Sequence, residues 1–191
     1  MPSVSTVLLA GGASKRMGRD KALLELPGTN LLLWQRQWQL LEGLRPVEML
    51  WSGPPRPHLP DRAIVVPDRI KSVGPLGGLS ACLDALQTDL LVLLAVDLPR
   101  MNLAFLEGLL APCTQERGMV ARHGDFFEPM AAVYPKRLHL LAAEYLAEGR
   151  HVMQDFIREA VQQEALATVQ LEERDRALFK NLNSPSDLTE A

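Results

Sequence analysis

A glycine-containing and strongly basic segment near the amino terminus has the residue types that bind phosphate. The stretch LLAGGASKRMGRDK occupies residues 8–21 and holds three glycines and four cations beside one acid. Gly11 and Gly12 allow a close approach or a positive φ, which leaves successive N–H groups free to point at oxygen anions. Arg16 and Lys21 can add full charge. The segment favours a phosphorylated ligand over the simpler alternative, a strand-exit turn whose cations are only solvated.

The spacing of these glycines excludes the common phosphate-binding loops. Neither G-x-x-x-x-G-K-[ST] nor G-x-G-x-x-G is present. A G-x-S-x-G elbow is also missing, so serine hydrolase chemistry has no support. The four histidines and two cysteines show no metal-ligand spacing. The leading hypothesis is therefore that the segment binds phosphate through a loop that matches neither of these two patterns.

An aspartate that follows a wholly apolar run is the second candidate. Asp97 comes directly after residues 90–96 and before Leu98-Pro99, a context that favours a carboxylate at the rim of a sheet. Mg²⁺ prefers hard oxygen ligands and commonly takes one or two protein carboxylates, with phosphates and waters completing its shell. Asp97 is therefore a candidate Mg²⁺ ligand. From the residues alone, a turn aspartate is an equal alternative.

Three further polar residues stand where strands are expected to end. Asp68 follows a short apolar segment, and Asn181 and Asn183 precede a Ser-Pro-Ser-Asp capping arrangement. Asp68 is equally well explained as a solvated loop acid. For the asparagines, the first interpretation from periodicity is that they only satisfy backbone groups at a strand end.

Strand-like and helix-like segments alternate along the chain. Such alternation predicts a three-layer α/β/α sandwich with a mostly parallel, Rossmann-like sheet. An antiparallel strand is expected near residues 131–134, and residues 165–179 fit no element. The predicted strands are residues 4–10, 47–51, 63–66, 90–96, 119–121 and 131–134, and the predicted helices are residues 30–44, 74–86, 102–110, 135–146 and 152–161.

Length and composition restrict the class of protein. The chain has 191 residues, 47% of them hydrophobic, which predicts one domain over residues 1–191. A net charge of −3 speaks against binding to nucleic acid or an anionic membrane. No apolar run approaches the roughly 20 residues that cross a bilayer, and the first residues lack a cationic signal region. We expect a soluble cytoplasmic protein.

The glycine-containing segment resembles the signature of the molybdenum cofactor guanylyltransferase family of nucleotidyltransferases. The resemblance rests on Leu9-Ala10-Gly11-Gly12, Ser14, Arg16-Met17-Gly18 and Asp20-Lys21, and on the later motifs Asp97-Leu98-Pro99 and Asn181-x-Asn183. It implies a nucleotide-diphospho-sugar transferase-like fold and transfer of GMP from GTP to molybdopterin, with release of pyrophosphate. It also implies Mg²⁺ as cofactor, and transient contacts with molybdenum cofactor insertion proteins or molybdoenzymes.

The same resemblance implies roles for individual residues. Arg16, Lys21 and Asp97 are expected to be catalytic: the two cations neutralise the β- and γ-phosphates, and Asp97 holds the metal. Asn181 and Asn183 are expected near the pterin or the metal. Glu128 and Arg150 lie in a looser-matching acceptor region and receive no role. The residues expected to contact the nucleotide are Leu9, Ala10, Gly11, Gly12, Lys21, Asp68 and Asp97.

One departure from the family leaves rival functions open. Some relatives carry an asparagine after the second strand that helps to hold the nucleotide, whereas Trp51-Ser52-Gly53 stands here. Transfer from CTP, or to another phosphorylated acceptor such as a sugar phosphate, therefore remains an alternative. A nucleotide-binding module without turnover is another. A glycosyltransferase usually needs two neighbouring acids for its metal, and Asp97 has none beside it in Leu98-Pro99.

Overall fold

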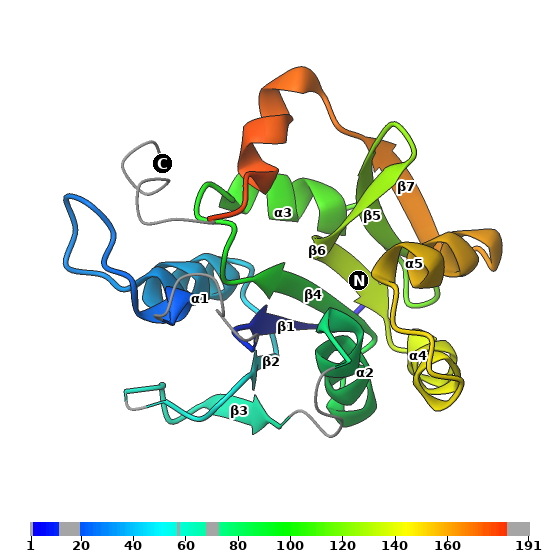
Figure 1. The fold of residues 1–191 in the computed structure, drawn as a ribbon, viewed down its shortest axis with the longest axis horizontal. Helices are drawn as coiled ribbons and strands as arrows, with labels where there is room; N and C mark the ends of the chain where they lie inside the picture. Colours follow the sequence, from blue (N-terminus) through cyan, green and yellow to red (C-terminus); the bar gives the residue numbers. More distant parts are fainter. Residues whose placement is uncertain (1, 12–19, 57, 68–72, 183–191) are drawn as a thin grey trace.

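The chain folds around a single seven-stranded sheet (Figure 1), as the computed structural model shows. The structure describes residues 2–11, 20–56, 58–67 and 73–182. The strand order is β3-β2-β1-β4-β6-β5-β7, and β6 is the one described strand that runs against the others. The strands are β1 (Val4–Leu9), β2 (Glu48–Ser52), β3 (Ala63–Val66), β4 (Leu90–Ala95), β5 (Gly118–His123), β6 (Phe126–Pro135) and β7 (Leu166–Gln170).

Helices cover both faces of the sheet and complete the three layers. One face carries α1 (Leu33–Gly43), α3 (Leu103–Leu110) and the short 3-10 helix η1 (Lys21–Leu23). The other face carries α2 (Pro75–Ala85), α4 (Leu138–Ala147) and α5 (Met153–Gln162). The predicted three-layer, mostly parallel sandwich with an antiparallel strand is therefore confirmed.

The central strand β4 is apolar at every position because both of its faces are buried. Leu91 and Leu93 face the core under α2, whereas Leu90, Val92 and Leu94 face the core under α1. All five side chains are fully buried. A parallel strand with a helix layer on each side has no solvent face, so its sequence does not alternate between apolar and polar.

Two differences from the predicted elements lie in the second half of the chain. β6 extends from Phe126 to Pro135, so the predicted strand at residues 131–134 is only its buried end. Residues 165–179, which fitted no element, contain the edge strand β7 and the 3-10 helix η2 (Glu173–Phe179). In the missed part of β6 only Phe126 is exposed, but Glu128 and Pro129 interrupt the apolar residues, and in β7 three of the five residues are exposed. Neither segment therefore has the uninterrupted apolar run on which the prediction depended.

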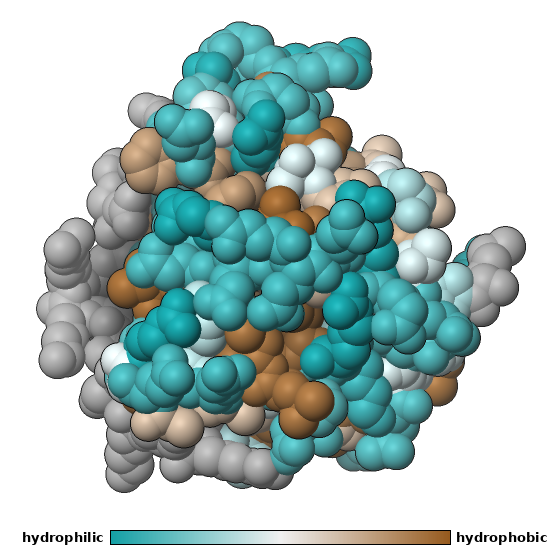
Figure 2. All heavy atoms as spheres, turned by 90° about the vertical axis from the view of Figure 1, so that its right-hand side faces the viewer, coloured by the Kyte–Doolittle hydropathy of each residue, from teal (hydrophilic) through white to brown (hydrophobic). Residues whose placement is uncertain are grey.

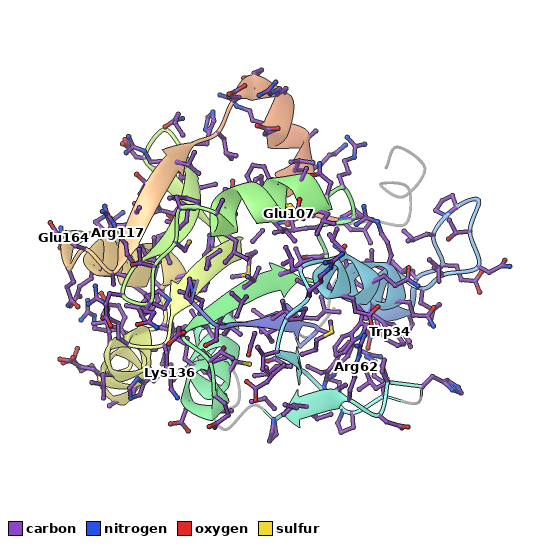
Figure 3. All side chains as sticks on the ribbon, turned by 180° about the vertical axis from the view of Figure 1, so that it is seen from behind. Trp34, Arg62, Glu107, Arg117, Lys136 and Glu164 are labelled. Atoms are coloured by element: carbon purple, nitrogen blue, oxygen red, sulfur yellow. The ribbon has the colours of Figure 1, made fainter. Side chains whose placement is uncertain are left out.

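The two ends of the sheet can be told apart in Figure 3. In Figure 3, Trp34 lies near the end where β1 and β4 finish, and Lys136, Arg117 and Glu164 lie toward the opposite end.

The face made by α4 and α5 is mostly hydrophilic, with a small apolar patch (Figure 2). None of the helices in the described part of the chain is long and apolar enough to cross a membrane.

Candidate active site

The two segments that the sequence singles out leave the sheet side by side. β1 and β4 are parallel neighbours, and their register pairs Leu9 with Ala95. The amide of Val96 donates to the carbonyl of Leu9 at 3.0 Å, so this pairing continues to the last residues of both strands. Ala10-Gly11 and Asp97 therefore emerge at the same carboxyl edge, which is where open α/β sheets bind ligands.

The helix η1 brings a lysine to this edge. Asp20 caps η1, because its Oδ1 accepts the amide of Ala22 at 3.0 Å. Ala22 is fully buried against α1 and anchors the turn. Lys21 Nζ lies 3.6 Å from Asp97 Oδ2, and the two side chains are 20% and 29% exposed. A cation and a carboxylate from separate parts of the chain thus meet at a point that solvent, and therefore a ligand, can reach.

Two residues of α1 hold the loop that carries Asp97. The side chain of Gln37 is fully buried, and its Nε2 donates to the carbonyl of Leu98 at 2.6 Å. Arg36 donates from Nη2 to the carbonyl of Met101 at 2.8 Å and from Nη1 to Gln37 Oε1 at 2.7 Å. Sequence reasoning missed both residues, because nothing in their local pattern indicates a partner some 60 residues away.

Replacing Gln37 by methionine is expected to lower the free energy of unfolding by about 2 kcal/mol, since a buried carbonyl and the Arg36 guanidinium each lose a partner. Urea denaturation followed by circular dichroism measures this difference. Gln39→Met is the matched control, because Gln39 lies on the exposed side of the same helix. Equal unfolding midpoints for the two variants would contradict the role of Gln37.

The loop after β2 packs directly on the start of the glycine-containing segment. The amide of Ala10 donates to the carbonyl of Ser52 at 2.8 Å. Gly53 has a φ of +152°, and a Cβ added there would meet the Ala10 carbonyl carbon and the Gly11 nitrogen at 3.0 Å each. Only glycine allows two backbone segments to approach so closely. The tripeptide Trp51-Ser52-Gly53 thus has a packing role here.

We expect Gly53→Ala to destabilise the fold by about 1–3 kcal/mol, through backbone strain and displacement of Ala10 and Gly11. Thermal unfolding of the purified variant tests this. Gly28→Ala separates the two causes, because Gly28 has a φ of +72° but nothing within 4 Å of an added Cβ. If both variants unfold at the same temperature, the close approach contributes nothing and the explanation is wrong.

A hollow of about 340 Å³ lies between the β5–β6 hairpin and η2, near the edge of the sheet that carries Asp97. β6 pairs with β4 through Ala131 and Leu94, so Glu128 and Asp97 both lie toward this edge. Burial raises the pKa of the Glu128 carboxyl above its usual range. The hollow combines two cations, one carboxylate and two aromatic rings. It is lined by His123, Phe126, Glu128, Leu171, Arg176, Phe179 and Lys180.

The asparagine motif reaches the same edge from the end of the described chain. Leu182 is fully buried, and its amide donates to the carbonyl of Asp97 at 2.9 Å. This bond brings the exposed Asn181 to the neighbourhood of Asp97. Arg150, in contrast, binds Glu148 and Glu159 between α4 and α5 and takes no part in these contacts.

The structure brings together part of the predicted site. Leu9 and Ala10 are nearly buried at the strand end, Gly11 is exposed, and Lys21 meets Asp97. Asn181 is nearby through its neighbour Leu182. The predicted residues Gly12, Arg16, Asp68 and Asn183 lie outside the described residues.

The donor set at this edge suits a metal that is shared with phosphate. Among the described residues, no group of three or more His, Cys, Asp or Glu side chains could hold a metal by itself. Asp97 offers an accessible carboxylate. Such a lone carboxylate fits Mg²⁺ when phosphates and waters supply the remaining ligands.

Comparison with known proteins identifies similar chains. Residues 6–168 match the model of the MobA-like NTP transferase domain. A protein of Opitutus terrae named as a probable molybdenum cofactor guanylyltransferase is 37% identical, over 97% of this chain and 93% of its own. A molybdenum cofactor guanylyltransferase of Syntrophotalea carbinolica is 32% identical, over 96% and 88%. In structure, a nucleotidyl transferase of Methanothermobacter thermautotroptrophicus has a TM-score of 0.77 at 18% identity, over 98% and 95%.

Proposed function

Because this chain belongs to the family of MobA-like NTP transferase domains, we propose that it transfers GMP from GTP to molybdopterin and releases pyrophosphate. The observation that carries the proposal is the meeting of Lys21 and Asp97, 3.6 Å apart at the edge where Ala10-Gly11 leaves β1. Relatives named molybdenum cofactor guanylyltransferase match nearly the whole chain and support the choice of substrates.

The proposed reaction is a displacement at the α-phosphorus of GTP. A terminal phosphate oxygen of molybdopterin forms the new P–O bond, and the bond to pyrophosphate breaks. This nucleophile is already anionic and needs no strong base. The main barrier is the approach of two polyanions, so positioning and charge neutralisation should provide most of the catalysis.

Each residue of the site has a part in that neutralisation. The amide of Gly11 would face the phosphates, and Lys21 would balance the charge that develops on the departing pyrophosphate. Arg16 is proposed to share this task. Asp97 would hold Mg²⁺, whose charge draws electron density from the phosphate oxygens when it is bound. Asp68 is proposed as a further contact of the nucleotide, and Asn183 of the pterin or metal.

The hollow beside Glu128 is the proposed acceptor site. Arg176 and Lys180 supply positive charge for the acceptor's phosphate, and Phe126 and Phe179 offer rings for a flat heterocycle. Its position next to Asn181 would bring an acceptor close to Asp97.

Incubation of the pure protein with molybdopterin and each of the four Mg-NTPs tests the proposal, with the products identified by mass. We expect the guanine dinucleotide and an equal amount of pyrophosphate, both lost when a chelator removes Mg²⁺. Binding of Mg-GTP without any dinucleotide would contradict it and indicate a binding module.

Cytidylyl transfer is the second candidate, and one observation favours it. At the end of β2 stand Ser52, which is buried, and Gly53, and neither residue type has an amide side chain that could select a guanine base. Formation of the cytosine dinucleotide in the same panel would replace the first candidate by the second.

A further inference from the structure

We propose that Arg56 is a positioning residue, which holds Lys21 in place through Asp20. This inference rests on the proposed function, because it takes Lys21 to act on the triphosphate. The evidence is a chain of contacts that runs from Arg56, in the loop after β2, through Asp20 to Lys21 in η1.

The first contact is an ion pair between segments far apart in sequence. Arg56 Nη2 pairs with Asp20 Oδ2, and the side chain of Arg56 is only 8% exposed. The Arg56 guanidinium carbon lies 5.5 Å from the ring centroid of Trp51. Trp51 is itself fixed, because it is fully buried and its Nε1 donates to the carbonyl of Pro54 at 2.9 Å. The cation therefore has a rigid support, and a fixed cation fixes its carboxylate partner.

The second contact carries this restraint to the lysine. Asp20 uses its two oxygens separately: Oδ2 binds Arg56, and Oδ1 accepts the amide of Ala22. The carbonyl of Asp20 also accepts the amide of Leu23 at 3.1 Å. Lys21 lies between these bonds, so the direction of its side chain toward Asp97 depends on where Asp20 is held.

The same loop after β2 holds both described ends of the glycine-containing segment. Ser52 and Gly53 contact Ala10 and Gly11 at one end, and Arg56 holds Asp20 at the other. A catalytic group gains most when the residues around it have set its position before the ligand binds. In this arrangement the loop after β2 sets the position of the glycine-containing segment before the ligand binds.

A double-mutant cycle between Arg56 and Asp20 tests the proposal. Arg56→Met removes the charge and keeps much of the length, whereas Asp20→Asn keeps the Oδ1 cap and weakens the ion pair. We expect each variant to lower kcat/KM for Mg-GTP by about tenfold, mostly in kcat, and the double variant to be no worse than either. Arg56→Lys should recover part of the loss. Arg62→Met is the control, because Arg62 forms an exposed ion pair with Glu42 near the same loop.

Hydrogen exchange measured by mass spectrometry gives a second readout that needs no substrate. In Arg56→Met, the peptide over residues 20–24 should exchange faster, while the melting temperature stays near that of the wild type. Unchanged exchange would overturn the proposal. Losses in kcat/KM that multiply to about a hundredfold would also overturn it, because Arg56 would then act independently of Asp20. If the wild-type protein releases no pyrophosphate, the proposed function fails, and the exchange result alone decides whether Arg56 holds Asp20 and η1.

Discussion

Replacing Asp97 by asparagine is expected to lower nucleotidyl transfer by at least about a hundredfold while the fold is retained. The change removes the negative charge that would hold Mg²⁺ and keeps nearly the same shape. The backbone bond from Leu182 to the carbonyl of residue 97 does not involve the side chain and should persist. The ion pair with Lys21 is partly exposed, so its loss should cost less than about 1 kcal/mol of stability.

The rate of pyrophosphate release over a range of Mg²⁺ concentrations measures this effect, and thermal unfolding checks the fold. Asp61→Asn is the matched control, because Asp61 is exposed in the turn before β3. Asp97→Asn should also require much more Mg²⁺ for any remaining activity. A variant that turns over at the wild-type rate at limiting Mg²⁺ would exclude Asp97 as the metal ligand.

Replacing Lys21 by methionine should produce the second large loss, also about a hundredfold in kcat/KM. Methionine keeps much of the length and apolar body of lysine but cannot balance charge on a leaving pyrophosphate. The loss should appear mainly in kcat if the charge acts in the transition state, and in KM if it only binds the triphosphate. The side chain is 20% exposed and the cap on η1 does not depend on it, so we expect little change in stability.

Steady-state kinetics with varied Mg-GTP separates these two cases. Lys136→Met is the control, because Lys136 lies toward the opposite end of the sheet (Figure 3). If both lysine variants keep the wild-type kcat and KM, Lys21 has no role in the reaction, and the proximity to Asp97 is a surface ion pair only.

Much of the fold could be predicted because its central elements have recognisable patterns of apolar residues in their own sequence. The run at residues 90–96 contains the whole of β4, and the predicted helix at residues 30–44 contains the whole of α1 but begins three residues before it. The edge strand β7 could not be predicted in this way. Of its five residues only Leu166 is buried, and its position comes from pairing with β5. A strand that is held by its neighbour's backbone needs no apolar pattern of its own.

For the site, the sequence by itself determined which residues are candidates: the glycines and cations of residues 8–21, and an aspartate held before Leu98-Pro99. These features are local, since turn glycines, charge and the restriction imposed by proline act within a few residues. Only the tertiary structure decided which of them meet. The register between β1 and β4 brings the segments that carry Lys21 and Asp97 to one edge, and the packing of α1 and of the loop after β2 gives Gln37 and Arg56 their partners. Contacts of this kind depend on how distant segments pack, because no residue type encodes its partner across a sheet.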